Sequence, residues 1–282
     1  VAEDMAPICA AIALVALGVA VQPKRLVLSS GFLCFSNHVG VLRALDAAGE
    51  LERGKLGAIV GTSSGAIVGS MLAAGMGVDE IAALVSARRP LALCRPTLRP
   101  WRGLFSASRL GEVLEAVLPE RFEDLRTPLA VGVARADRAG AASTAAVLSA
   151  GPLVPAILAS CAVPAMFQPV AVGGVKYVDG GIVDRTCVEV SAPFWRGISS
   201  AWGGAGASEG ATLVHLISDR PDVELGPRDG ITDARGLTII RTRRTRQSLA
   251  RRFGAVFDEE VARAAAECAA VLAGRAASAS HR

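Results

Sequence analysis

Short apolar segments alternate with helical patterns along most of the chain, and this alternation limits the fold more than any other feature. The apolar segments are four to seven residues long and lie at 26–29, 56–60, 129–134, 175–178, 211–217 and 237–240. Apolar residues recur at helical spacing in segments 38–49, 66–74, 78–87, 107–118, 153–160 and 257–272. Continuous apolar runs are typical of parallel strands that helices cover on both faces. The pattern predicts an α/β domain with a mostly parallel central sheet.

The length of 282 residues fits one large domain or at most two. We expect an apolar N-terminal segment over residues 1–21 and the α/β domain over residues 22–255. A C-terminal amphipathic helix followed by a disordered tail is expected over residues 256–282, with the tail beginning after Gly274.

The N-terminal segment has a run, residues 5–21, that carries no charge and is almost wholly apolar. Its length is at the lower limit of a bilayer span. Three interpretations stay open: a membrane anchor, the hydrophobic part of a targeting peptide, or a first helix packed on the domain. We therefore expect the protein to be associated with a membrane, with the N-terminal run as one means of anchoring and the compartment undetermined.

The composition excludes several kinds of site. A net charge of +4 without a finger or an aromatic-interleaved basic motif argues against nucleic-acid binding. The six cysteines include no C-x-x-C pair, which predicts free thiols and no zinc site. The chain has three histidines, His38, His215 and His281, so imidazole-dependent catalysis has few places to occur.

A G-x-S-x-G motif spans Gly61 to Gly65 and centres on Ser63. It follows an apolar strand and opens a helix, which is the context of a nucleophile elbow: the glycines allow a tight turn and the helix N-terminus favours an oxyanion. A second match centres on Ser208, but it lies in a Gly/Ser-rich loop without a strand before it or an apolar helix after it. Ser63 is therefore the predicted nucleophile.

The residues alone do not decide which group would act as the base that activates this serine. The order Ser63, Asp179, His215 matches a triad, but His215 lies in the middle of a strand, where a core histidine is commoner. A structural or capping role suffices for His38. Asp179 follows a strand and precedes Gly180 and Gly181, which fits either a projecting carboxylate base or an ordinary turn.

Three segments in sequence order resemble the patatin-like phospholipases: GTSSGAIVGSMLAAG at 61–75, ILASCAVPAMFQPV at 157–170 and KYVDGGIVD at 176–184. The resemblance covers roughly residues 25–245. It implies a three-layer α/β/α sandwich, a Ser–Asp dyad of Ser63 and Asp179, hydrolysis of lipid acyl esters through an acyl-enzyme, and no metal or cofactor.

The loop after the first strand departs from this resemblance. The family's G-G-G-x-Arg-Gly is replaced by residues 30–35, SGFLCF, where only Gly31 matches and Cys34 stands in place of the arginine. Because backbone N–H groups form an oxyanion hole, Gly31 and Phe32 are still the predicted donors. The alternatives are a catalytically impaired lipid-binding or membrane-scaffold protein, a Ser63–Asp179–His215 triad esterase, and a transacylase.

The expected partners are a lipid substrate, whether phospholipid, galactolipid or acylglycerol, and a membrane surface. Two Arg-rich stretches, 88–102 and 241–252, are candidates for contact with anionic headgroups. Solvated basic surface is the alternative interpretation of both stretches.

Overall fold

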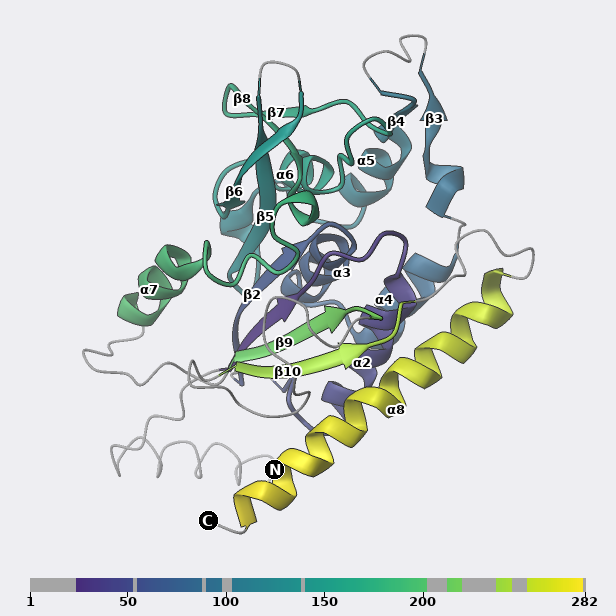
Figure 1. The fold of residues 1–282 in the computed structure, drawn as a ribbon, viewed down its shortest axis with the longest axis vertical. Coiled ribbons are helices and arrows are strands. Elements are labelled where there is room, and N and C mark those ends of the chain that lie inside the picture. The colour runs from purple at the N-terminus through teal and green to yellow at the C-terminus, as the bar shows by residue number, and fades with distance from the viewer. Residues whose placement is uncertain are drawn as a thin grey trace, which may run out of the picture.

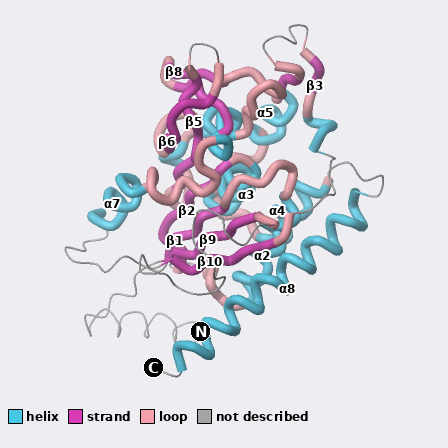
Figure 2. Tube along the Cα trace, viewed as in Figure 1, coloured by secondary structure: helices cyan, strands magenta, loops and turns pink. Residues whose placement is uncertain are grey.

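An eight-stranded mixed sheet forms the centre of the molecule (Figures 1 and 2). The computed structural model describes residues 24–52, 55–87, 90–97, 103–137, 140–201, 212–219, 237–244 and 253–280. The strands of this sheet are β1 (Lys24–Leu28), β2 (Leu56–Thr62), β5 (Leu129–Ala136), β6 (Ala142–Leu148), β7 (Val170–Val172), β8 (Val175–Asp179), β9 (Thr212–Ile217) and β10 (Leu237–Thr242). A separate ribbon pairs β3 (Arg95–Pro96) with β4 (Phe105–Ser106).

The strand order is β10-β9-β1-β2-β5-β8-β7, with β6 also paired to β5. The five strands from β10 to β5 are parallel, while β6, β8 and β7 form antiparallel pairs. The predicted α/β class with a mostly parallel sheet is therefore confirmed. The strands β6 and β7 were not expected, because β6 is rich in Ala, Ser and Thr and β7 has three residues.

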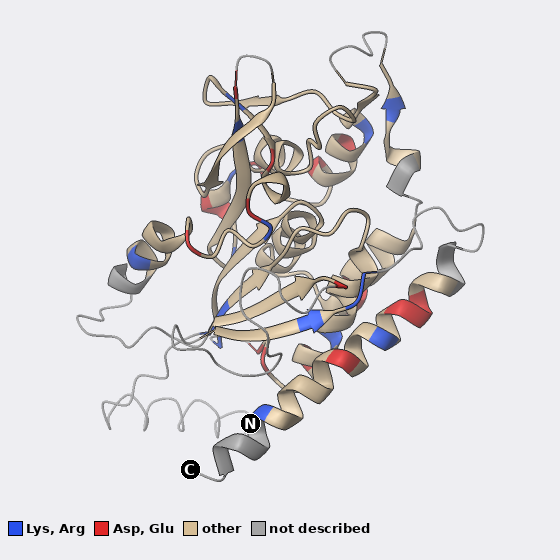
Figure 3. Ribbon diagram, viewed as in Figure 1, with Lys and Arg blue, Asp and Glu red and all other residues tan. Residues whose placement is uncertain are grey.

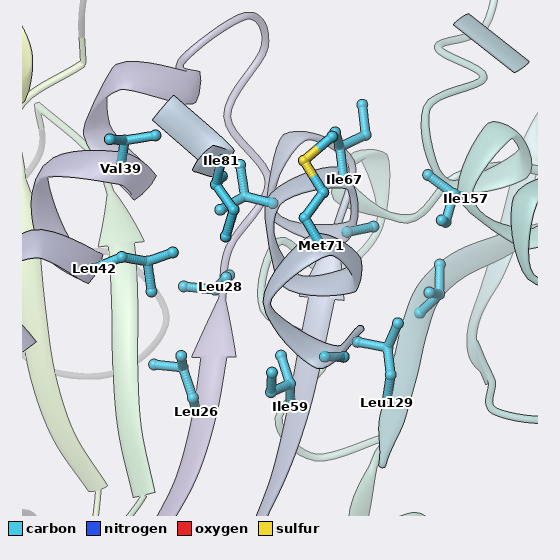
Figure 4. Packing of buried hydrophobic residues seen from close by; sticks show 14 of the residues in the cluster. Leu26, Leu28, Val39, Leu42, Ile59, Ile67, Met71, Ile81, Leu129 and Ile157 are labelled. Carbon is cyan, nitrogen blue, oxygen red and sulfur yellow. The ribbon is translucent and has the colours of Figure 1, made fainter. Parts of the chain in front are cut away.

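Helices cover both faces of the sheet, which confirms the three-layer arrangement. The helices are α2 (Phe35–Ala47), α3 (Ser64–Ala73), α4 (Val78–Ser86), α5 (Ser108–Glu115), α6 (Leu153–Ser160), α7 (Ala192–Ala201) and α8 (Phe253–Ser280), with 3-10 turns η1 (Pro90–Leu93), η3 (Phe122–Asp124) and η4 (Gly180–Ile182). Successive residues of β1 pack on opposite sides: Leu26 and Leu28 belong to the large core under α2, α3 and α8, whereas Val27 packs in a smaller core with Trp195 of α7. Figure 4 shows the large core between the sheet and the helices.

The C-terminal helix is longer than its pattern indicated. The amphipathic segment 257–272 lies within α8, but α8 continues to Ser280, so the expectation of a disordered tail after Gly274 is wrong as far as Ser280. Phe257, Val261 and Cys268 belong to the large core, and charged residues alternate along the other side of the helix (Figure 3). The helix approaches α2 so closely that a Cβ on Gly40 would lie 2.4 Å from a carbonyl oxygen of α8.

The N-terminal segment 1–21 lies outside the described residues. Among the helices that the structure describes, none is both long enough and apolar enough to cross a bilayer.

Candidate active site

The sheet topology brings the ends of β2 and β8 together beside β5. β2 pairs with the first half of β5 and ends with Thr62 opposite Gly132, while β8 runs the other way along the second half, with Asp179 opposite Val133. β6 occupies the other edge of β5 along both halves. Because a strand has two edges, β2 and β8 share one edge and meet end to end. Ser63, which follows β2, is therefore next to Asp179.

Ser63 lies in a strained turn between β2 and α3. Its backbone has φ 54° and ψ −118°, outside the regions that L-residues favour. Gly61 and Gly65 make the turn possible: a Cβ on Gly61 would lie 2.5 Å from the Gly65 carbonyl oxygen, and a Cβ on Gly65 would collide with the Leu28 carbonyl. The turn between β2 and α3 is therefore tight, with Ser63 at its strained position.

Ser160 connects this turn to the sheet. The Ser63 N–H donates to the Ser160 hydroxyl over 2.8 Å, and that hydroxyl donates to the Gly132 carbonyl over 2.6 Å. All three groups are buried. The contact fixes Ser63 relative to β5, the strand that also pairs with Asp179.

Asp179 is a buried carboxylate that interacts with the Ser63 hydroxyl. Its side chain is 3% exposed, and burial raises its pKa to about 6, although hydrogen bonds from the Ser63 hydroxyl and the Gly181 N–H favour the ionised form. The Gly181 N–H lies 2.8 Å from Asp179 Oδ1. Gly180 packs against the backbone of Gly132, where a Cβ would lie 2.7 Å from the carbonyl oxygen. Gly180 thus permits close backbone packing, whereas a Cβ on Gly181 would collide with the Ser30 side chain.

The predicted oxyanion loop, residues 30–34, lies beside this pair. Phe32 and Leu33 line the same cavity as Ser63, and Leu33 has φ 60°. The Gly31 carbonyl accepts the Cys34 N–H at 2.9 Å and the Ser64 hydroxyl at 2.7 Å. No partner for the Phe32 N–H occurs in the described part of the chain.

Two residues that hold this loop were not expected from the sequence. The G-x-S-x-G motif centres on Ser63 and gives no role to Ser64, and no motif in the sequence marks Arg185. The Arg185 guanidinium donates to the Ser30 carbonyl over 3.1 Å, while the Ser30 N–H donates to the Arg185 carbonyl over 2.7 Å. Neither role has a local sequence signal, because each contact joins residues far apart in the chain.

An apolar cavity opens beside Ser63. Its other lining residues come from the oxyanion loop, α2, α3, η1, α5 and the segment after α6, and they are Phe32, Leu33, Phe35, Ser64, Ile67, Leu93, Cys94, Ala107, Leu110, Cys161, Val163, Met166 and Phe167. Because nearly all of these side chains are apolar, the cavity suits a hydrocarbon chain better than a polar ligand.

Cys161 is a further nucleophilic group in this cavity. Burial and the nearby charge of Asp179 raise the pKa of its thiol well above the usual value, although the Ser63 hydroxyl opposes this. The thiol therefore stays protonated and is a poor nucleophile. Cys161 is one of the five free cysteines in the described residues, which are Cys34, Cys94, Cys161, Cys187 and Cys268.

The histidines do not join this pair. His38 and His215 are fully buried and hydrogen-bond each other through their Nδ1 atoms at 2.9 Å. Their Nε2 atoms bond to Ser64 and Thr242, so both ring nitrogens of His215 are occupied away from Ser63 and Asp179. This geometry argues against the triad alternative.

Several predicted features lie outside the described residues. They are Ser208, His281 and most of the Arg-rich stretches, of which only 90–97 and 241–244 are described. Within the described residues no cluster of three or more His, Cys, Asp or Glu side chains could hold a metal ion. Arg243 of the second stretch forms an ion pair with Glu267 at 2.9 Å.

Comparisons with known proteins agree with this geometry. The family model described as "Patatin-like phospholipase" matches residues 26–191. Uncharacterised NTE family proteins of Mycobacterium bovis and Mycobacterium tuberculosis are 36% identical over 163 residues, which is 56% of this chain and 42% of theirs. The chain thus spans less than half the length of these relatives. The crystal structure of VipD from Legionella pneumophila superposes with a TM-score of 0.54 and 13% identity, covering 91% of this chain and 67% of that one, and supports the fold alone.

Proposed function

Since this chain belongs to the patatin-like phospholipase family, we propose that it hydrolyses lipid acyl esters with Ser63 as nucleophile and Asp179 as general base. The observation that carries the proposal is the interaction of the Ser63 hydroxyl with a buried carboxylate beside an apolar cavity. The substrates are phospholipids, galactolipids or acylglycerols, whose acyl chain the cavity accepts.

The first half of the reaction forms an acyl-enzyme. Ionised Asp179 takes the proton of the Ser63 hydroxyl as the oxygen attacks the ester carbonyl carbon. The backbone N–H of Phe32, with that of Gly31, and the N-terminus of α3 stabilise the negative charge on the carbonyl oxygen. The C–O bond to the alcohol breaks, and Asp179 returns the proton to the departing alcohol.

The second half releases the fatty acid. Asp179 takes a proton from water as the water oxygen attacks the acyl-enzyme carbonyl. The ester bond to Ser63 breaks, and the proton on Asp179 returns to the Ser63 oxygen. A carboxylate whose pKa is about 6 can both accept and return a proton near neutral pH.

A fluorophosphonate probe and a medium-chain p-nitrophenyl ester test this assignment. The full chain should label at one serine and release p-nitrophenol, while Ser63→Ala should abolish both. Asp179→Asn should lower ester hydrolysis at least about 10²-fold, as expected for loss of a general base. Ser208→Ala, which changes the other G-x-S-x-G serine, is the matched control and should behave as wild type.

The other outcomes of this experiment are distinct. A folded protein that does not label contradicts the enzyme assignment and favours a lipid-binding or scaffold role. Labelling at Ser208 instead of Ser63 contradicts the assignment of Ser63 as the nucleophile. Acyl transfer to an added alcohol in place of fatty-acid release identifies a transacylase on the same dyad.

We also propose a lipid surface as the place of reaction. Four large apolar side chains are exposed in the described residues, and all belong to segments that border the site: Phe32, Leu104, Ile182 and Val183. Ile182 and Val183 follow Asp179 in η4 and just beyond it. The Leu104 N–H bonds to Ala165, next to the cavity residue Met166. These exposed apolar side chains, on segments that border the proposed dyad and here called the apolar rim, fit a membrane surface.

Flotation with phosphatidylcholine vesicles tests this rim. Ile182→Glu should reduce vesicle binding and phospholipid hydrolysis several-fold while hydrolysis of the soluble ester persists. Ala262→Glu places the same charge at an exposed position on α8 and should change neither. Binding to vesicles with added phosphatidylglycerol measures the contribution of the Arg-rich stretches separately. Equal loss of soluble-ester activity in Ile182→Glu would contradict a docking role.

A further inference from the structure

A continuous chain of buried hydrogen bonds runs from the end of β10 to the oxyanion loop. The Asn37 Nδ2 lies 2.8 Å from Thr242 Oγ1, which lies 2.9 Å from His215 Nε2. His215 Nδ1 lies 2.9 Å from His38 Nδ1, and His38 Nε2 lies 3.2 Å from Ser64 Oγ. The Ser64 hydroxyl ends the chain on the carbonyl of Gly31 at 2.7 Å. The members come from α2, β9, β10 and α3, and all their side chains are buried.

The group at the loop end fixes the direction of the protons. A carbonyl oxygen only accepts, so the single proton of Ser64 is donated to Gly31. The Ser64 oxygen must then accept from His38, which places a proton on His38 Nε2 and leaves its Nδ1 as an acceptor. His215 therefore donates from Nδ1, and its Nε2 accepts.

The group at the other end is compatible with the same direction. Asn37 Nδ2 also lies 2.8 Å from the carbonyl of Arg243, which can only accept, so this atom is the donor of the amide. Thr242 accepts from Asn37 and gives its own proton to His215 Nε2. The Asn37 end thus accommodates the tautomers that the Gly31 end requires, and every link is then one donor facing one acceptor.

The two imidazoles stay neutral in this arrangement. A proton added to His38 would place two N–H groups face to face between the Nδ1 atoms, and a proton added to His215 would place an N–H against the hydroxyl proton of Thr242. Burial lowers the pKa of His38 to about 3, although the Ser29 carbonyl favours its charged form. Burial and the neighbouring His38 lower the pKa of His215 well below its usual value. The pair is therefore a fixed dipolar link and does not act as an acid or a base.

The last link sets the orientation of one peptide group. In a trans peptide the carbonyl of one residue and the N–H of the next point in opposite directions. The Gly31 carbonyl is held by Ser64 and by the Cys34 N–H, so the N–H of Phe32 points away from the buried chain. Phe32 and Ser63 line the same cavity, and the Phe32 N–H has no partner in the described part of the protein.

We propose that His38, His215 and Ser64 are positioning residues of the oxyanion hole, which aim the Phe32 N–H at the reacting carbonyl through the Gly31 peptide. This role rests on the proposed hydrolase function. It gives the strained loop with Leu33 at φ 60° a support from inside the protein. It also explains why two uncharged histidines and an asparagine occupy a region that apolar side chains could fill at lower desolvation cost.

Kinetics of two serine variants on α3 test the loop end of the chain. Ser64→Ala removes the donor to Gly31 and should lower kcat for the soluble ester about 10- to 100-fold with KM within about twofold, less than the ~10²–10³ of a lost donor. Ser70→Ala is the matched control: Ser70 is equally buried on the same helix and donates to the Ile67 carbonyl, without a link to Gly31. Equal kcat values for the two variants would overturn the proposal.

Two amide replacements of His38 test the direction of the chain. The glutamine amide nitrogen reaches the position of Nε2 and can still donate to Ser64, whereas the asparagine amide reaches only the position of Nδ1. His38→Gln should therefore keep a higher kcat than His38→Asn. A purely structural role predicts no such order, and the reverse order contradicts the proposal.

Ring-nitrogen NMR of 15N-histidine protein tests the chain without using activity. His38 should carry its proton on Nε2 and His215 on Nδ1, with both rings neutral at pH 6, and the Phe32 amide resonance should shift in Ser64→Ala but not in Ser70→Ala. Reversed tautomers or a charged ring would overturn the proposal. If the fluorophosphonate probe does not label the wild type and the wild type cleaves no ester, the proposed hydrolase function is wrong. These spectra then still decide whether the hydrogen-bond chain orients the Phe32 peptide.

Discussion

The hydroxyl oxygen of Ser160 lies 2.8 Å from the backbone nitrogen of Ser63, and it accepts the N–H of the proposed nucleophile. The same hydroxyl donates to Gly132 on β5, the strand against which Asp179 also pairs. One buried side chain therefore fixes the strained turn at Ser63 relative to Asp179, the proposed base. Because this N–H is already bonded to Ser160, it is not available as an oxyanion donor.

We predict that Ser160→Ala lowers both stability and activity. The change leaves the Ser63 N–H and the Gly132 carbonyl unpaired in a buried region, which costs about 1–3 kcal/mol of unfolding free energy. The elbow loses the contact that holds its positive φ, so kcat should fall more than stability alone explains. Ser191→Ala is the control, because Ser191 is fully buried and donates to the Val188 carbonyl away from the site. Urea unfolding and ester hydrolysis of both variants check the prediction, which equal kcat values would contradict.

The close packing of α3 on β1 predicts a steep difference between two glycine positions. A Cβ on Gly65 would collide with the backbone carbonyl of Leu28, which no side-chain movement can relieve. Nothing lies within 4 Å of a Cβ on Gly77, and its φ of −68° suits any residue. Gly65→Ala should therefore fail to fold or lose several kcal/mol, whereas Gly77→Ala should stay within about 1 kcal/mol of wild type. Thermal unfolding of the two variants measures the difference, and similar melting temperatures would show that α3 can move.

The sequence indicated the parallel core because the strands β1, β2, β5 and β9 are apolar runs buried on both faces, a pattern that is readable locally. It missed β6 and β7 because their pairing depends on β5 and β8 and not on their own hydrophobicity. The end of α8 was missed because the residues after Gly274 show no apolar periodicity, although the alanines among them have high helix propensity.

At the site, Ser63 and Asp179 were identified because each is flanked by glycines after a strand. Ser160, Ser64 and Arg185 act through partners far away in the sequence, at separations from 28 to 155 residues. Only the folded arrangement of the strands and the loops that follow them reveals these contacts. The two buried histidines were interpreted as structural or as a triad member, and their mutual hydrogen bond could not be inferred from one sequence.

The raised pKa of Asp179 predicts an acid limb in the pH profile. As the proposed base, Asp179 must be ionised, so kcat/KM should rise about tenfold per pH unit below pH 6 and level off above about pH 7. The histidines should not contribute, because the pKa of His38 is about 3 and that of His215 is also lowered. The His38→Gln variant should keep the same limb at a lower rate. If the pH of the acid limb shifts in this variant, the limb reports the imidazole of His38 and not Asp179. 13C spectra of labelled aspartate measure the titration of Asp179 directly.

The same buried carboxylate predicts that Asp179→Asn stabilises the protein while removing activity. The folded-state pKa, about 6, exceeds the usual value of 3.8, so between these values the folded state binds more protons than the unfolded state. Stability from this group is therefore present below about pH 4 and lost as the pH rises through 6, at a cost on the order of 2–3 kcal/mol. Asparagine keeps an oxygen for the Gly181 N–H and carries no charge, so it should raise the unfolding free energy at pH 8 and have little effect at pH 4. Asp79→Asn, at an exposed carboxylate, should change it by less than about 0.5 kcal/mol at either pH. Destabilisation by Asp179→Asn at pH 8 would mean that the ionised carboxylate stabilises the fold, and that its burial is not a cost accepted for catalysis.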